Sequence, residues 1–171
     1  TYNQEKYIRK CLDSILSQKT SFNFEIIVHD DASQDATPAI IIEYQKKYPD
    51  LIVLILQKEN CYRSSKNLPL LNCAQAARSD FIALCEGDDY WINNQKLEKQ
   101  YGMMKMNANT TLVISPGRME YNGRVLSKIH CWHGKKVRLF HAQDVLDAVN
   151  QFAPTASYFL RKDILIQSLK T

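Results

Sequence analysis

No apolar run in this sequence is long enough to cross a membrane. The longest, such as residues 51–56, fall far short of the about 20 residues that a spanning helix needs. The 171 residues are 45% hydrophobic and 23% charged, which excludes a disordered or fibrous chain and suffices for one domain with its own core. There is no initiator methionine, and the sequence begins within a motif, so we expect a piece of a longer chain.

The sequence also lacks a C-x-x-C pair, and its five cysteines are odd in number, so they give no disulfide framework. Cys11, Cys73 and Cys85 fall in apolar patterns, where cysteine behaves as a small hydrophobic residue. We therefore expect reduced thiols and a cytoplasmic protein.

Charge is unevenly distributed along the chain. Residues 101–171 carry ten basic and four acidic side chains, whereas residues 1–100 carry twelve basic and fourteen acidic ones. A basic surplus of this size suits phosphates, an acidic acceptor or peripheral contact with the inner face of an anionic membrane. It is too weak to indicate a nucleic-acid partner.

Three motifs of common enzyme classes are absent. There is no G-x-x-x-x-G-K-[ST] and no G-x-G-x-x-G, which removes the main support for a P-loop or dinucleotide-binding protein. There is no G-x-S-x-G, which argues against a serine hydrolase of the nucleophile-elbow type.

Helical and strand-like patterns alternate over the first hundred residues. Such alternation predicts the α/β class, with a Rossmann-like, mostly parallel sheet flanked by helices. The predicted helices are residues 3–18, capped by Asn3, then 37–48, 64–77 and 94–106, and the predicted strands are 24–29, 51–57 and 80–86. Further along we expect strands over 112–115, 120–126 and 156–160 and helices over 143–149 and 162–169.

Two pairs of carboxylates follow predicted strands, where ligands bind on parallel sheets. Asp88 and Asp89 follow the predicted strand 80–86, and the repulsion between their two carboxylates calls for a counter-charge. Oxygen ligands suit Mg²⁺ or Mn²⁺, so a divalent cation is one interpretation. The alternative is that they only cap the following helix and favour its positive end.

The other pair, Asp30 and Asp31, lies in a polar loop with Ser33 and Asp35. A carboxylate can accept the imide N–H of uracil, so this loop can read a base or ribose. The alternative is a loop that satisfies its own backbone. The stretch 62–67, with Arg63 and Lys66, likewise suits an anion or is a solvated helix start.

His130, Cys131 and His133 contain metal-ligand types. Their spacing matches no standard zinc finger, and no second pair of ligands follows to complete a tetrahedron. An aromatic, histidine-lined acceptor loop is the favoured interpretation.

Taken in order, these segments resemble the family 2 glycosyltransferases, whose fold is GT-A. Residues 1–3 resemble the end of the family's P-T-Y-N, and residues 11–18 (C-L-D-S-I-L-S-Q) its first helix. Residues 25–37 resemble E-I-I-V-x-D-D-G-S-x-D-x-T. Residues 83–91 (A-L-C-E-G-D-D-Y-W) are similar to the D-x-D-type metal motif of a bacterial branch, and 96–100 (K-L-E-K-Q) to its continuation.

The resemblance implies a transferase that moves a sugar, with inversion, from a nucleotide diphosphate, UDP above all, to a polysaccharide, lipid-linked or other glycan acceptor. It implies residues 1–107 as the donor half and 108–171 as the start of the acceptor half of one domain. It implies Tyr2 beside the base, Asp31 accepting from the base with Asp30 next to it, and Lys66 near the diphosphate. Asp88 is expected near the ribose and metal, and Asp89 on Mn²⁺ or Mg²⁺.

Two departures from the family pattern shape the expectations. The family's first strand, which precedes Thr1, is missing, so we expect a gap in the sheet between residues 24–29 and 80–86. No acidic motif follows Arg161, so the general base is unassigned, with Asp144 and Asp163 as weak candidates and a position after Thr171 favoured. The alternatives are a non-catalytic sugar-nucleotide-binding module and a nucleotidyltransferase, the latter disfavoured because residues 1–7 hold no glycine.

Overall fold

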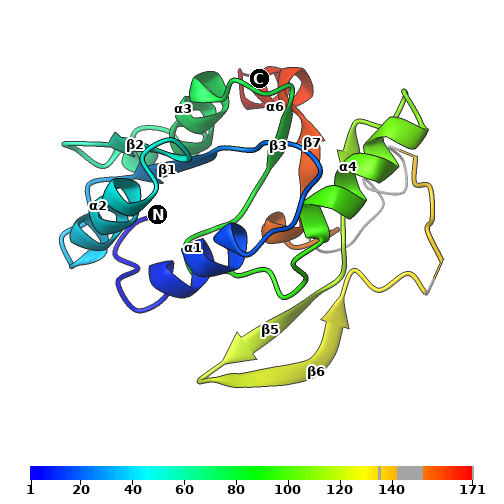
Figure 1. The fold of residues 1–171 in the computed structure, drawn as a ribbon, viewed down its shortest axis with the longest axis horizontal. Coiled ribbons are helices and arrows are strands. Elements are labelled where there is room, and N and C mark those ends of the chain that lie inside the picture. The colour runs from blue at the N-terminus through cyan, green and yellow to red at the C-terminus, as the bar shows by residue number, and fades with distance from the viewer. Residues whose placement is uncertain (135, 142–151, 171) are drawn as a thin grey trace.

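The computed structural model describes residues 1–134, 136–141 and 152–170, and Figure 1 shows their arrangement. Helices and strands alternate through the first half, as predicted. The elements in chain order are α1 (Ile8–Leu16), β1 (Ile26–Asp30), α2 (Thr37–Lys47), β2 (Ile52–Leu56), η1 (Cys61–Arg63), α3 (Leu68–Ala76), β3 (Phe81–Ala83), α4 (Lys96–Met106), β4 (Leu112–Val113), β5 (Gly117–Tyr121), β6 (Arg124–His130), η2 (Thr155–Ser157), β7 (Phe159–Arg161) and α6 (Lys162–Lys170). The predicted helix 143–149 lies outside the described residues.

Strands β1 and β2 are parallel neighbours, in register from Ile26 opposite Ile52 to Asp30 opposite Leu56. The apolar run of β1 is buried because α1 and α2 pack around it. Their shared core consists of Ile8, Cys11, Leu12, Ile26, Val28, Ile40, Ile41, Tyr44 and Ile52. This core holds the carboxyl end of β1 in place.

Strand β3 belongs to a second sheet, of order β3-β7-β4, in which β7 runs antiparallel to both neighbours. The prediction that β1 and β3 do not pair with each other is confirmed. Thr1 lies at the end of β1, where its amino nitrogen donates to His29 O over 2.7 Å and its carbonyl accepts from Asp31 N over 3.0 Å.

Several predicted boundaries are wrong, among them the start of the helix expected over 64–77, which begins at Leu68. Helix α1 starts at Ile8 rather than near Asn3, because Asn3 has φ 52° and its Oδ1 accepts from Gln34 N instead of capping the helix. Strand β3 stops at Ala83. The predicted strand 156–160 is split, because residues after Pro154 form η2 and the strand begins only at Phe159.

The predicted single strand over 120–126 is instead a hairpin, β5–β6, which projects from the body of the domain (Figure 1). Its turn residues Asn122 and Gly123 have φ values of 49° and 74°. Asn-Gly at a two-residue turn is a strong hairpin signal, and it was overlooked.

Within the described residues no helix is both long and apolar enough to span a bilayer.

Lys96, at the start of α4, is unusual because its ammonium is buried. The residue is 8% exposed, its Nζ donates to Gln100 Oε1 over 2.7 Å, and it lies 4.2 Å from the ring centroid of Trp91. Burial disfavours the charged form and lowers the pKa of Lys96 to about 8.

This buried lysine predicts a rise in stability with pH. Between the folded pKa and the ordinary value of 10.5, the unfolded chain binds more protons than the folded one. The free energy of unfolding should therefore rise by about 2 kcal/mol from pH 7.5 to 9.5 on account of this residue. Urea titrations of the native protein and of Lys96→Met at both pH values measure it. Lys96→Met should lack this increment, and an identical pH response of the two proteins would contradict the prediction.

Candidate functional site

A pocket of about 590 Å³ opens at the carboxyl edge of β1 and β2, and we call it the edge pocket. Its walls come from the amino-terminal segment, the loop after β1 and the loop after β2. The lining residues are Tyr2, Ala32, Ser33, Gln34, Gln57, Lys58, Glu59, Asn60 and Arg63. This is the edge at which ligands bind on parallel α/β sheets.

Asp30 shapes the first turn of the pocket wall. It is 2% exposed, and its carboxylate accepts from Ser33 N over 3.0 Å and from Ser33 Oγ over 2.6 Å. Ala32, between them, has φ 63°, a left-handed conformation. The Asp30 carboxylate therefore holds the loop rather than facing the pocket.

Asp31 joins this loop to the loop after β2. It is 4% exposed, and it accepts from Cys61 N over 2.8 Å, from the Cys61 thiol over 2.8 Å and from Tyr62 N over 3.0 Å. Burial by itself raises the pKa of Asp31, but the hydrogen bonds from Cys61 and Tyr62 outweigh it and hold the pKa below its ordinary value. Asp31 is thus an anionic anchor beneath the pocket, 30 residues away in sequence from the groups that it holds.

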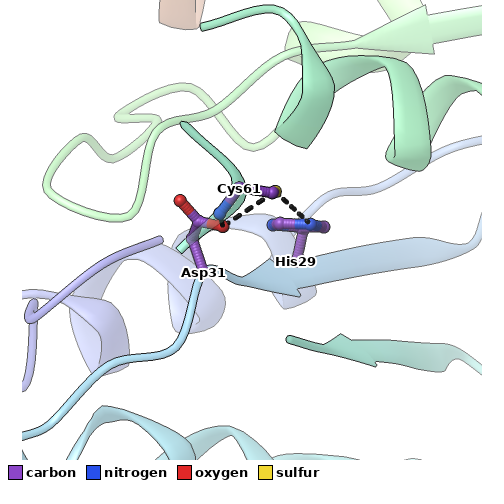
Figure 2. A group of neighbouring side chains, drawn as sticks. All are labelled: His29, Asp31 and Cys61. Carbon is purple, nitrogen blue, oxygen red and sulfur yellow. Dashed lines mark hydrogen bonds between the residues drawn. The ribbon is translucent and has the colours of Figure 1, made fainter. Parts of the chain in front are cut away.

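His29 lies beside this anchor, and Figure 2 shows its ring facing Cys61. It is 4% exposed, and its Nε2 is 3.2 Å from Gln57 Nε2 and 3.8 Å from Cys61 Sγ. Burial lowers the pKa of His29, so the ring is neutral near pH 7. His29, Asp31 and Cys61 each offer a ligand atom within 4.8 Å of the others. Neither His29 nor Cys61 has a role predicted from the sequence, although His29 directly precedes the predicted Asp30–Asp31 pair.

A second acidic group follows β3. Asp88 is exposed, while burial and the neighbouring charge of Asp88 raise the pKa of Asp89. Burial, Asp89 and Asp88 likewise raise the pKa of Glu86. In the described ranges no Lys or Arg forms a salt bridge with any of the three. Carboxylate oxygens are the ligands that Mg²⁺ and Mn²⁺ prefer, but these three side chains do not converge as one metal-ligand group among the described residues.

Residues 1–4 link the two acidic regions. Tyr2 lines the edge pocket, and Asn3 N donates to Ser33 Oγ over 2.9 Å. On the other side Gly87 is packed so tightly that a Cβ there would lie 2.8 Å from Thr1 Oγ1 and 2.1 Å from Gln4 Oε1. The two carboxylate pairs follow strands of two separate sheets, and this short segment links the regions that carry them.

The two aromatic residues after Asp89 hold residues 86–89, which we call the acidic loop, in place. Trp91 N donates to Ser14 Oγ over 3.0 Å, and its indole Nε1 donates to Ala156 O over 2.9 Å. The Tyr90 hydroxyl donates to Glu120 of β5, which also pairs with Lys10 Nζ at 2.9 Å. Helix α1, the acidic loop and the hairpin are thereby joined at one place.

Other predicted residues lie elsewhere. Lys66 is exposed before α3 and does not line the edge pocket, whereas Arg63 does. Asp163 lies two residues after Arg161. Arg161 of β7 is the strand partner of Phe81, at the amino end of β3 and thus at the end away from the acidic loop. There Asp163 accepts from Ile164 N over 2.9 Å and pairs with Arg161. Asp144 lies outside the described residues.

The loop with His130, Cys131 and His133 forms no metal-ligand group in the described parts of the chain, where the only such group is His29, Asp31 and Cys61. His133 instead packs on Phe140 and Phe152, with ring centroids 4.6 and 5.7 Å away. The sequence favoured an aromatic, histidine-lined acceptor loop here, and the acceptor role stays a prediction.

The family is shown by the match of residues 1–169 to the model of glycosyl transferase family 2. The chain therefore belongs to this family. It is 45% identical over 121 residues to the uncharacterized protein Rv1520 of Mycobacterium tuberculosis, covering 71% of this chain and 34% of that protein. It is 30% identical over 129 residues to a poly(ribitol-phosphate) beta-glucosyltransferase of Bacillus spizizenii, covering 74% of this chain and 19% of that enzyme.

Solved structures show the same fold. Residues 1–349 of TarS from S. aureus, in complex with UDP, match 98% of this chain and 46% of that one, with a TM-score of 0.66 and 21% identity. The mannosyltransferase PcManGT from Pyrobaculum calidifontis, in complex with GDP-Man and Mn²⁺, matches 66% of this chain and 32% of that one, with a TM-score of 0.57 and 24% identity. The predicted GT-A fold is confirmed. The chain spans about a third of the length of its 45%-identical relative.

Proposed function

We propose that this domain binds a UDP-linked sugar in the edge pocket and transfers the sugar, with inversion, to a hydroxyl group of a cell-wall glycan. The observation that carries the proposal is the arrangement around residues 1–4, which contact the edge pocket on one side and the acidic loop at Gly87 on the other. A nucleotide base and the diphosphate attached to it need two such neighbouring places.

The proposed binding roles follow from that arrangement. Tyr2 stacks beside the base, and Asp31, held by the loop after β2, accepts the imide N–H of uracil while Asp30 maintains the loop. Arg63, on the pocket wall, and Lys66, close to it in sequence, supply positive charge for the diphosphate. Asp88 approaches the ribose. The donor half is residues 1–107, with residues 108–171 starting the acceptor half.

Asp89 and Asp88 are the proposed ligands for Mn²⁺ or Mg²⁺. The chemistry that such an ion supplies, when bound, is neutralisation of the charge that develops on the leaving diphosphate. The chain's own contribution is to hold both carboxylates in place through Tyr90 and Trp91. The raised pKa of Asp89 is consistent with a site that lacks its counter-charge.

The acceptor hydroxyl must lose a proton to a base at the reacting edge. Asp163 lies at the other end of β3. We therefore propose that a carboxylate outside the described residues, Asp144 or one elsewhere in the full protein, is the base.

An anionic cell-wall polymer is the proposed acceptor class. Among the relatives are the poly(ribitol-phosphate) glucosyltransferase and a minor teichoic acid biosynthesis protein of Bacillus subtilis, GgaA. The surplus of basic side chains in residues 101–171 suits a phosphate-bearing or lipid-linked acceptor at an anionic membrane surface.

Calorimetric titration with UDP, GDP and ADP, with and without Mn²⁺, tests the proposal. We expect UDP to bind best and Mn²⁺ to increase its affinity at least tenfold, because the ion offsets repulsion between two anionic groups. Hydrolysis of UDP-sugars, followed by release of UDP, then separates an enzyme from a non-catalytic binding module. Failure of all three nucleotides to bind in the presence of Mn²⁺ would overturn the proposal.

A further inference from the structure

We propose that His29, Asp31 and Cys61 form a binding site for a zinc-class transition metal beside the edge pocket, separate from the hard-cation site at Asp88 and Asp89. The three side chains come from the end of β1 and the start of η1, and Figure 2 shows them turned toward one another. The donor set is one imidazole nitrogen, one carboxylate oxygen and one thiol sulfur.

The spacing of the donor atoms suits a four-coordinate ion. Ligand atoms at about 2.0–2.3 Å from a tetrahedral zinc lie about 3.4–3.6 Å apart. Cys61 Sγ is 3.8 Å from His29 Nε2 and 2.8 Å from Asp31 Oδ1, and all three ligand atoms lie within 4.8 Å of one another. Binding needs the thiol and carboxylate to separate by less than 1 Å, as the thiol proton between them leaves to solvent, and it needs the imidazole nitrogen and the carboxylate oxygen, now within 4.8 Å, to lie about 3.4 Å apart.

The side chains around His29 indicate which ring nitrogen is unprotonated, and the two amides that lie against Nε2 must turn aside for a metal. The Nδ1 of His29 is buried with no hydrogen-bond partner among the described residues, whereas the side-chain amides of Gln57 and Asn72 lie 3.2 and 3.4 Å from Nε2. Amide NH₂ groups donate, so Nε2 is the unprotonated nitrogen and Nδ1 carries the proton. A neutral imidazole with Nε2 unprotonated is the form that binds metals.

The site also has ordered support around its ligands. Asp31 Oδ2 is held by Tyr62 N, and Asp31 N donates to Thr1 O, so the carboxylate is fixed while Oδ1 faces the cluster. Gln57 and Asn72 can hydrogen-bond a water in the fourth position. Such surrounding contacts orient ligands and raise metal affinity.

Chemical softness distinguishes the two metal sites. Thiolate and imidazole favour Zn²⁺ and Co²⁺, whereas sites of carboxylates alone favour Mg²⁺ and Mn²⁺. A chain with both can hold Mg²⁺ or Mn²⁺ at Asp88 and Asp89 while zinc occupies the site beside the edge pocket.

Occupancy has a consequence for the donor, which rests on the proposed function. Asp31 is the proposed acceptor for the base, and a bound metal withdraws its negative charge. The metal also pins η1, whose N-cap Asn60 and last residue Arg63 line the edge pocket. Zinc should therefore weaken UDP binding.

Cobalt titration of the protein, in thiol-free buffer with excess Mg²⁺, tests the metal site directly. One equivalent of Co²⁺ should produce a thiolate-to-cobalt charge-transfer band and the visible bands of four-coordinate cobalt, and Zn²⁺ should remove them. Cys61→Ser should lose the charge-transfer band and bind Co²⁺ at least tenfold more weakly. Cys73→Ser, which changes a nearby thiol outside the cluster, should retain both. Absence of the band from the native protein, or its retention in Cys61→Ser, overturns the site.

UDP titrations with and without Zn²⁺ test the consequence, and Cys61→Ser corrects for zinc chelated by UDP itself. Zinc should weaken UDP at least tenfold more in the native protein than in Cys61→Ser. If the cobalt band forms but zinc affects both proteins equally, the effect on the donor is wrong and the metal site stands. If UDP binds neither protein even with Mn²⁺, the proposed function fails, and the cobalt band alone still decides the metal site.

Discussion

Asp89→Ala should abolish the Mn²⁺-dependent part of UDP binding and leave the fold intact. Asp89 is the half-buried member of the acidic loop, and its raised pKa reflects burial and the neighbouring charge of Asp88. Removing this carboxylate relieves repulsion in the folded protein but takes away an ion ligand. We expect a loss of at least tenfold in UDP affinity at saturating Mn²⁺, or about 1.4 kcal/mol, and little change without metal.

Asp80→Ala is the matched control, because Asp80 is exposed at the opposite end of β3. It should leave UDP affinity and its metal dependence unchanged. Calorimetric titrations with and without Mn²⁺ measure both variants, and thermal unfolding checks that they fold. Undiminished metal dependence in Asp89→Ala would show that the ion binds elsewhere.

Asp31→Asn should weaken UDP more than it weakens inorganic diphosphate. An amide can accept only one of the two backbone N–H groups that the carboxylate now holds, at Cys61 and Tyr62, and it turns an NH₂ toward the other. It also loses the charged acceptor proposed for the uracil imide. The expected loss for UDP is roughly 1.5–3 kcal/mol, typical of a hydrogen bond to a charged group.

Asp50→Asn is the control for this variant, since Asp50 is exposed ahead of β2, at the end away from the edge pocket. Competition titrations of UDP and diphosphate against both variants measure the difference. An equal loss for the two ligands would mean that Asp31 only holds the loop after β2 and does not read the base.

The cluster of His29, Asp31 and Cys61 could not be predicted from the sequence, because its members lie far apart along the chain. Cys61 is 32 residues from His29, and nothing in the local pattern at either position indicates that they meet. Asp31 had been predicted from its place after a strand, but its partners at Cys61 and Tyr62 follow the next strand. The parallel pairing of β1 with β2 brings these loops together, and pairing is a long-range property.

The hairpin differs in this respect. Asn122 and Gly123 carry the local signal for a two-residue turn, so the sequence itself contains the information that predicts this hairpin. In contrast, no local pattern indicates that Glu120 of this hairpin reaches Tyr90 and Lys10.

By itself the sequence determined the alternation of helices and strands, the GT-A class and the position of two carboxylate pairs at strand ends. The alternation and the carboxylate pairs follow from hydrophobic periodicity and from polar residues that terminate buried runs, which are local properties of the chain. The GT-A class follows from the resemblance of its motifs to family 2. Only the tertiary structure decided that β7 pairs antiparallel with β3 and β4, and that Asp163 lies away from the acidic loop. It alone decided that residues 1–4 join the two acidic regions and that His29, Asp31 and Cys61 converge. Those contacts join residues about 30 to 85 positions apart, and they arise because packing of the core, rather than any local preference, sets which segments become neighbours.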